Sequence, residues 1–285
     1  MIPDVDGDSV VYLNGQYTRL ADAKVSVLDR GFIFGDGIYE VVPFYRGRPF
    51  RMDEHLARLE RSLASIGIHP GFTLDDWRAL VLDMASRSPY NHFTVYLQIT
   101  RGPAKRDHAF PETPQPTVFC MTSPFTPPSA QQREQGLTAI SAPDIRWLRC
   151  EIKSISLLGN VLAKQHAVDA GVDEVLQFRD GLLTEGASCN AWIARDGVLA
   201  APPLDNLILE GIRYRFMEDL AAKAGIPFEA RQITQDEVAQ ADEIMLTSAT
   251  KEVLPVVQFN GNPVGTGRPG PIYAALRGAY DQILG

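Results

Sequence analysis

The chain has 285 residues, 45% of them hydrophobic and 22% charged, which is typical of a globular protein with a sizeable core and excludes a disordered one. Its formal net charge of -8 argues against nucleic acid or an anionic membrane as the main partner, because both favour a basic face. No run of 18 apolar residues occurs, so no membrane span is predicted.

Cysteine and histidine usage argues against metal sites and disulfides. The cysteines Cys120, Cys150 and Cys189 are odd in number and widely spaced, without a CxxC pair. The five histidines show no spacing typical of metal ligands. Residues 1–8 are acidic and lack the basic segment and apolar run of a secretory signal. These features predict a cytoplasmic protein without a metal.

The first elements in chain order form a predicted β-hairpin. Residues 10–13 and 16–18 are rich in strand-forming side chains, and Asn14-Gly15 between them supplies the positive φ angles of a tight turn. Apolar residues at helical spacing and β-rich runs follow. They predict helices over 52–66 and 75–88 and strands over 93–100 and 117–122.

A proline-rich segment predicts the boundary between two domains. Residues 123–129 contain three prolines, which lack a backbone donor and fix φ, so this segment is not expected in a central strand or a helix. We therefore expect a small N-terminal α/β domain over 1–121, a linker over 122–132 and a large C-terminal domain over 133–285.

The second half predicts a mostly antiparallel meander flanked by helices, hence an α+β or mixed α/β fold. The predicted strands cover 174–178, 181–185 and 190–194, and Asp-Gly pairs at 180–181 and 196–197 favour tight turns. Helices are expected over 157–170 and 209–224. Gly171 and Gly225 follow them, as is usual at helix ends.

Of the six lysines, Lys153 is the strongest candidate for chemistry. It lies in an extended stretch that leads into a helix, a place that would direct it from a sheet end into a cleft between the domains. Burial lowers the pKa of an amine and makes it a usable nucleophile and base. Taken alone, a lysine in such a place is more often structural.

Three further segments could bind an anionic cofactor. The expected helix start at residues 209–213 offers free backbone donors, and Gly211 allows close approach. Residues 246–250 add hydroxyls and amides in an expected loop. Glu185 ends an apolar strand, where a carboxylate could keep a pyridine nitrogen protonated. Each feature alone is equally an ordinary helix cap, loop or solvated strand end.

Six motifs occur together and in a fixed order. They are RGFIFGDGIYE at 30–40, DEHLARL at 53–59, EIKS at 151–154, LGN at 158–160, TEG at 184–186 and GTGRPGP at 265–271. In this order they resemble the class IV aminotransferase family over nearly the whole chain.

The resemblance implies a two-domain homodimer of the fold type IV class that uses pyridoxal 5'-phosphate bound in the C-terminal domain. It implies that Lys153 is the Schiff-base lysine and proton carrier and that Glu185 lies at the pyridine nitrogen. The remaining residues that the resemblance and the helix and loop positions assign to the cofactor are Arg58, Leu209, Gly211, Ile212, Arg213, Ser248, Ala249 and Thr250.

Within the family the chain is most similar to the D-amino acid transaminases. There, an arginine and a histidine two residues apart bind the substrate α-carboxylate with a tyrosine, and these fall on Arg106, His108 and Tyr39. A guanidinium fork suits a carboxylate, and residues two apart in an extended loop project to the same side. The resemblance implies exchange of an amino group between a D-amino acid such as D-alanine and a 2-oxo acid such as 2-oxoglutarate or pyruvate.

The chain also departs from this pattern. D-selective members often carry serines after the Glu-Gly pair and a threonine after the helix isoleucine, whereas this chain has Ala187, Cys189 and Arg213. The role of Arg213 therefore stays open between phosphate and substrate carboxylate.

Other functions were weighed against this one. The same fold could serve a branched-chain L-amino acid aminotransferase or an aminodeoxychorismate lyase, and a non-catalytic cofactor-binding dimer belongs to a different class. Residues 265–270 satisfy the glycine pattern of dinucleotide-binding proteins. Pro269 and Pro271 interrupt that turn, however, and no second strand with a ribose-binding acid follows, which argues against a nucleotide.

Overall fold

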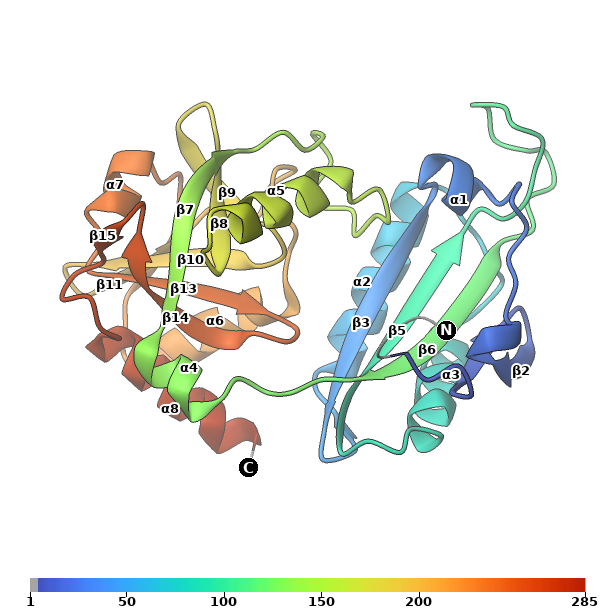
Figure 1. The fold of residues 1–285 in the computed structure, drawn as a ribbon, viewed down its shortest axis with the longest axis horizontal. Coiled ribbons are helices and arrows are strands. Elements are labelled where there is room, and N and C mark those ends of the chain that lie inside the picture. Colours follow the sequence, from blue (N-terminus) through green and yellow to red (C-terminus); the bar gives the residue numbers. More distant parts are fainter. Residues whose placement is uncertain (1–4, 285) are drawn as a thin grey trace. The chain divides into compact units, whose positions relative to one another are not determined.

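The computed structural model describes residues 5–284, and its internal contacts divide the chain into two units (Figure 1). The first unit comprises the described residues up to Phe125 together with Ile152–Leu157. The second comprises Thr126–Glu151 and the described residues from Leu158 onward. The chain first passes between the units inside the segment expected as a linker. Residues 1–4 and 285 lie outside the described residues. The first four belong to the N-terminus that is expected to lack a secretory signal, and the last belongs to the expected C-terminal domain.

The first unit is a six-stranded antiparallel sheet with the order β2-β1-β6-β5-β3-β4. Its strands are β1 (Val10–Leu13), β2 (Gln16–Arg19), β3 (Gly37–Tyr45), β4 (Arg48–Pro49), β5 (His92–Thr100) and β6 (Thr117–Pro124). Its helices are η1 (Leu20–Asp22), α1 (Arg30–Phe34), α2 (Met52–Ser65) and α3 (Leu74–Ser86).

The predicted hairpin is confirmed, and one strand extends further than expected. Asn14 and Gly15 have φ angles of 49° and 88°, which give the tight turn between β1 and β2. The prediction that residues 123–129 avoid a central strand is wrong at its start, because β6 lies between β1 and β5 and continues to Pro124. Proline is tolerated there because the strand ends at that residue.

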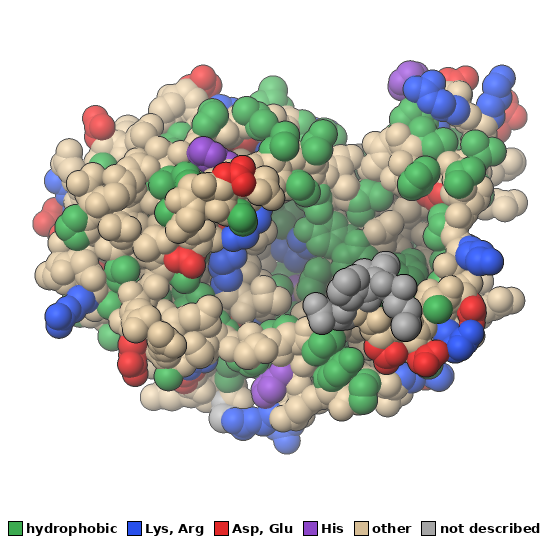
Figure 2. All heavy atoms as spheres, viewed as in Figure 1, with side chains coloured by type: hydrophobic (Ala, Val, Ile, Leu, Met, Phe, Trp, Pro, Cys, Tyr) green, Lys and Arg blue, Asp and Glu red, His purple; other side chains and the backbone are tan. Residues whose placement is uncertain are grey.

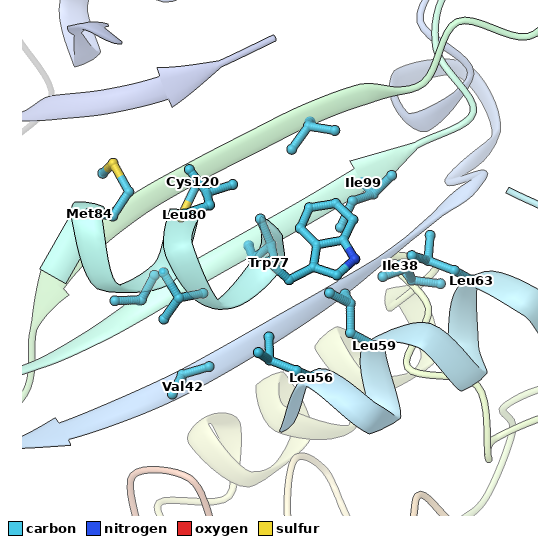
Figure 3. Close-up of a cluster of buried hydrophobic side chains, with 14 of the residues drawn as sticks. Ile38, Val42, Leu56, Leu59, Leu63, Trp77, Leu80, Met84, Ile99 and Cys120 are labelled. Carbon is cyan, nitrogen blue, oxygen red and sulfur yellow. The ribbon is translucent and has the colours of Figure 1, made fainter. Parts of the chain in front are cut away.

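Helices α2 and α3 cover one face of this sheet and enclose its core. Figure 3 shows apolar side chains of both helices directed toward strands β3 and β5, with Trp77 of α3 beside Leu59 of α2. Trp77 and Leu59 are completely buried. Thr73 and Asp76 form a reciprocal capping box that fixes the start of α3. The sheet and its two helices thus give a rigid base for the loops at its edge.

The second unit is built on a nine-stranded sheet with the order β12-β11-β10-β13-β14-β7-β8-β9, with β15 paired to β14. Its strands are β7 (Leu137–Pro143), β8 (Glu174–Arg179), β9 (Leu182–Gly186), β10 (Asn190–Arg195), β11 (Val198–Ala201), β12 (Phe228–Ala230), β13 (Glu243–Ser248), β14 (Glu252–Phe259) and β15 (Asn262–Pro263). Its helices are α4 (Ala130–Gln135), α5 (Leu158–Asp169), α6 (Ile212–Lys223), α7 (Gln235–Ala239) and α8 (Pro271–Leu284).

The expected meander over residues 174–194 is wrong in its last strand. Strands β8 and β9 pair as an antiparallel hairpin, but β10 pairs with β11 and β13 instead of β9. After β9 the chain turns sharply, with the amide of Gly186 donating to the carbonyl of Cys189 at 2.7 Å. The long-range ladder between β10 and β13 then takes the place of the local pairing.

The two predicted helices are present, and one begins later than expected. Gly171 and Gly225 follow α5 and α6 with φ angles of 67° and 69°, as their sequence predicts. Helix α6 begins at Ile212 rather than Leu209, because Gly211 is the extended N-cap and the Asn190 side chain donates to the carbonyl of Leu209 at 2.9 Å, which holds that residue outside the helix.

Within residues 5–284 no helix combines the length and the hydropathy needed to span a bilayer. The expected α+β fold is confirmed.

Candidate active site

Lys153 is fixed by its backbone in the first unit. Its carbonyl accepts from the amide of Tyr39 at 3.0 Å, and its amide donates to the hydroxyl of Ser62 on α2 at 3.3 Å. Next to it, Ser154 forms a β-bridge with Ile38. The segment Ile152–Leu157 is therefore held along the start of β3, and the position of the lysine is set by the sheet.

The amine of Lys153 faces an aromatic ring. Its Nζ lies 4.1 Å from the ring centroid of Tyr39, and that ring stacks on Tyr96 with centroids 5.8 Å apart. Among the described residues no carboxylate forms an ion pair with this amine. A half-buried lysine that contacts a phenol ring and no acid can bond covalently or carry a proton.

Arg58 lies in a buried charge cluster of the same unit. The Glu40 carboxylate accepts from Arg58 Nε at 2.7 Å and Nη2 at 2.9 Å, and it lies 2.8 Å from His55 Nδ1. Burial acts to raise the pKa of Glu40, but Arg58 and His55 outweigh it and hold that pKa well below its usual range. Glu40 therefore orients the Arg58 guanidinium, whose role at the phosphate stays a prediction.

We expect Glu40→Gln to lower the free energy of unfolding by about 3 kcal/mol, because a buried ion pair that loses one partner leaves a charge uncompensated. The pKa of Glu40 is lowered on folding from 4.5, so its contribution is complete above about pH 4.5 and is lost as the pH falls toward the folded pKa. The difference between native protein and variant should therefore shrink on acidification. Urea unfolding from pH 7 to pH 3 measures it.

The matched control for Glu40→Gln is Glu54→Gln. Glu54 pairs with Arg51 at 2.8 Å on the surface of α2, so this substitution removes a solvent-exposed ion pair. It should change the free energy of unfolding by less than about 0.5 kcal/mol. Equal effects of the two substitutions would contradict the assigned importance of the buried carboxylate.

Arg106 and His108 contact the same aromatic side chain. The Arg106 guanidinium carbon lies 5.6 Å from the ring centroid of Phe34 in α1, and the His108 ring lies 5.4 Å from it. Both side chains are solvent-exposed. Phe34 thus gathers the two groups that the sequence assigns to a substrate carboxylate.

The backbone of this loop is held by a buried arginine. Arg30 donates to the carbonyls of Asp107 at 2.5 Å and Ala109 at 3.2 Å, and its Nε donates to Asp36 at 2.7 Å. The loop lies at the upper right of Figure 1, and in the same place Figure 2 shows basic, acidic and histidine side chains close together. Arg30 supplies the internal support that an exposed loop needs for a defined shape.

Glu185 lies at the end of β9 in the second unit and is almost completely buried. Its carboxylate accepts from the amide of Leu209 at 3.0 Å and pairs with the Arg146 guanidinium. Burial raises the pKa of Glu185, and Arg146 opposes that effect. These two donors hold the carboxylate in place at the strand end.

Arg146 joins Glu185 to a second buried acid. Its Nη2 donates to Asp144 at 2.9 Å, and the same carboxylate accepts from the hydroxyl of Thr184 at 2.9 Å. Desolvation acts to raise the pKa of Asp144, but Arg146 lowers it below its usual value. The Arg146 guanidinium thereby links the ends of β7 and β9.

The start of α6 presents backbone donors. Gly211 is the N-cap and makes no side-chain capping hydrogen bond, so the first turn, which begins at Ile212, presents backbone amides to an anion. A Cβ at Gly211 would collide with the Asn190 side chain, so any larger residue here would force Asn190 to move. The Arg213 side chain is buried and donates from Nε to the Tyr280 hydroxyl at 2.9 Å, between α6 and α8. The Arg213 side chain therefore points away from the start of α6, and only its backbone amide lies there.

Residues 248–250 lie at the tip of the hairpin formed by β13 and β14. Ser248 pairs with Glu252 across the turn, and the Ser248 hydroxyl accepts from the amide of Lys251 at 3.0 Å. Ala249, Thr250 and Lys251 form the turn itself, and Thr250 is exposed. The tip therefore carries hydroxyls and amides, but the expected loop over 246–250 is wrong at its start, because residues 246–248 belong to β13 and pair with β14.

The groups that pyridoxal phosphate requires are present in the two units, and each unit is considered separately. The second unit supplies an uncapped helix start for an anion and a buried carboxylate for a ring nitrogen. The first unit supplies the Lys153 amine, which faces the Tyr39 ring and has no acidic partner in the part of the chain that the structure describes. Within residues 5–284 no cluster of three or more potential metal ligands occurs.

Sequence reasoning did not assign roles to Arg30, Phe34 and Glu40, which lie in the motif at 30–40, or to Arg146, which lies in none of the six motifs. Each has a contact with a residue distant in sequence, as Arg30 has with Ala109, so spacing alone gives no signal. The available signal was the combination of charge and apolar surroundings, as in the Glu40 strand, because charges in such strands need buried partners.

Comparison with known proteins gives consistent relatives. A sequence model of amino-transferase class IV matches residues 37–259. The chain is 39% identical to a D-alanine aminotransferase of Staphylococcus epidermidis, over 96% of this chain and 97% of that protein. It is 40% identical to a D-alanine aminotransferase of Bacillus licheniformis, over 96% of each chain.

Solved structures show the same fold. The branched-chain amino acid aminotransferase of Escherichia coli superposes with a TM-score of 0.92 at 24% identity, covering 97% of this chain and 95% of that one. The branched-chain aminotransferase of Thermoproteus uzoniensis, determined with norvaline, superposes with a TM-score of 0.89 at 25% identity, covering 98% of this chain and 95% of that one.

The expected two-domain architecture, the aminotransferase activity and the pyridoxal phosphate cofactor of the family are confirmed. The chain belongs to amino-transferase class IV.

Proposed function

We propose that the chain transfers the amino group of a D-amino acid, with D-alanine as a donor, to a 2-oxo acid such as 2-oxoglutarate or pyruvate. The observation that carries this proposal is the pair Arg106 and His108 against one ring, at the positions that the resemblance assigns to an α-carboxylate. The D-alanine aminotransferases that share 39% and 40% identity support it.

When bound, pyridoxal phosphate supplies an aldehyde that takes up the amino group and a ring that accepts the electrons released at Cα. Lys153 would hold it and carry the proton from Cα, since its amine pairs with no carboxylate among residues 5–284. Glu185 would keep the ring nitrogen protonated. The residues proposed to hold the phosphate and ring are Arg58, Leu209, Gly211, Ile212, Arg213, Ser248, Ala249 and Thr250.

Substrate handedness follows from where the carboxylate is held. Because the lysine that takes the proton lies on one side of the substrate, the enantiomer that reacts is the one whose Cα hydrogen points to that side. Arg106, His108 and Tyr39 would fix the carboxylate and so decide which enantiomer this is. A guanidinium binds a carboxylate through two parallel hydrogen bonds, which fixes orientation as well as affinity.

We infer that the active form is a homodimer in the cytoplasm. Apolar side chains of α5 are exposed, among them Leu158, Val161 and Val168, and exposed apolar patches are typical of protein interfaces. The three free cysteines are consistent with a reducing compartment. Sedimentation equilibrium and cell fractionation test these two assignments.

Steady-state assays with paired donors test the function. We expect D-alanine to be a better amino donor than L-leucine, and Arg106→Gln to lower kcat/KM for D-alanine by about 10- to 100-fold. That range corresponds to the loss of a charged hydrogen bond of about 1.5–3 kcal/mol. Most of the change should be in KM, because the carboxylate is bound before the reaction.

The matched control is Lys105→Gln, which removes the neighbouring positive charge from the same exposed loop. It should leave kcat/KM for D-alanine within about twofold. A preference of the native protein for L-leucine would instead indicate a branched-chain aminotransferase. Formation of pyruvate from D-alanine without transfer to an acceptor would exclude transamination.

A further inference from the structure

The hairpin tip of β13 and β14 is tied to a second segment of the same unit by one buried carboxylate. The residue after the tip, Lys251, places its Nζ 3.0 Å from Oε2 of Glu174, the first residue of β8. Glu174 is completely buried, while the Lys251 side chain is 21% exposed. The two residues are far apart in sequence, so this pair joins separate strands.

Glu174 also holds the segment that follows Glu185. Its other oxygen, Oε1, accepts from the amide of Ala187 at 3.3 Å, and Oε2 lies 3.6 Å from Cys189 Sγ. Ala187 and Cys189 are two of the positions where the chain departs from its D-selective relatives. One carboxylate thus contacts both the hairpin proposed for the phosphate and the strand end proposed for the ring.

The charges in this cluster depend on one another. Burial acts to lower the pKa of Lys251, but its acidic neighbours, the Glu174 carboxylate among them, hold the pKa above its usual value. Burial, with Glu174, raises the pKa of the Cys189 thiol, so this cysteine stays protonated as a donor. The only cation paired with Glu174 among the described residues is Lys251.

We propose that the Lys251–Glu174 ion pair is a positioning device that sets the spacing between the phosphate-binding hairpin and the Glu185 strand end, and thereby the affinity for pyridoxal phosphate. This inference rests on the proposed function, in which residues 248–250 bind the phosphate. The Lys251 amine is paired with Glu174, so it affects the phosphate only by holding the hairpin of β13 and β14 in place. Lys251 is therefore a positioning residue and not a catalytic one.

The test compares two ligands that differ only in the phosphate. Pyridoxal phosphate and pyridoxal are titrated into the cofactor-free native protein and Lys251→Met, and each Kd is measured from the absorbance change. We expect Lys251→Met to weaken pyridoxal phosphate by about 10- to 100-fold, as is usual when a supporting hydrogen-bond partner is removed. Pyridoxal should change by less than about threefold, because the ring contacts through Glu185 and Leu209 remain. Lys251→Arg, which keeps the cation, should restore most of the affinity.

Two further variants complete the experiment. Lys164→Met is the matched control, because Lys164 is exposed and donates to the carbonyl of Asp173, next to Glu174, without contacting that carboxylate. It should leave both affinities unchanged. If Lys251→Met does not fold, the double variant Glu174→Gln/Lys251→Met removes the pair without leaving a buried charge and should show the same selective loss.

The outcomes separate this inference from the proposed function. A Lys251→Met protein that binds pyridoxal phosphate as tightly as the native protein would overturn the positioning role alone. Equal weakening of both ligands would also overturn it, because that indicates general damage to the unit. A native protein that binds pyridoxal as tightly as pyridoxal phosphate would overturn the phosphate assignment itself.

Discussion

Lys153→Ala is expected to lower kcat by at least about 10⁴-fold with D-alanine and 2-oxoglutarate, the largest effect of any single substitution in this chain. The variant loses both the amine that holds the cofactor and the group that carries the proton. The same substitution should abolish an absorption band at about 410 nm, which is expected of this cofactor when it is joined to a lysine. Stopped assays and an absorbance spectrum of each purified protein measure the two effects.

Two controls separate amine chemistry from charge and from folding. Lys153→Arg keeps a cation that can lie over the Tyr39 ring, yet it should be as inactive as alanine because a guanidinium neither forms the bond nor releases its proton. Lys223→Ala removes an exposed lysine at the end of α6 and should retain full activity. Native turnover in either Lys153 variant would show that another residue carries the cofactor.

Glu185→Gln is the second large effect, with kcat expected to fall by about 10²- to 10³-fold. The amide is similar in size and can still accept from the amide of Leu209, but it carries no negative charge to keep a ring nitrogen protonated. Binding of D-alanine depends on other residues, so KM should change by much less than kcat. Steady-state kinetics across pH 6–9 with both proteins distinguishes the two parameters.

The control for this charge is Glu229→Gln in β12, where the carboxylate pairs with Arg231 on the surface. It removes the same charge from the same unit and should leave kcat unchanged. The buried environment should survive in the Glu185 variant, because Arg146 still pairs with Asp144. A Glu185→Gln enzyme with native kcat would remove this carboxylate from the proposed reaction.

Local features of the fold were predictable, and long-range pairings were not. The turn at Asn14-Gly15 and the glycines after α5 and α6 follow from conformations that few other residues adopt, so each could be identified from the sequence. The partner of β10 depends on β13, about fifty residues later, and nothing in the alternation of β10 distinguishes that partner from β9. The start of α6 was misplaced because Asn190, from another strand, holds the preceding segment.

The candidate site divides in the same way. Lys153 and Glu185 could be identified as site residues because their motifs resemble a known family. Phe34 also lies in such a motif, but its role could not be identified from the sequence. Its contact with Arg106 and His108 arises from the packing of a loop on α1. The Lys251–Glu174 pair likewise joins residues whose proximity comes only from the sheet.

The grouping of Ile152–Leu157 with the first unit makes that unit discontinuous in sequence. A peptide-bond cut between residues 126 and 151 would leave Lys153 on the C-terminal fragment and its backbone partner Tyr39 on the N-terminal one. The lysine would then reach its place only by intermolecular strand association, as in fragment complementation. The first unit is likewise complete only after the ribosome has synthesised residue 157, by which time residues 126–151 of the second unit have already been made.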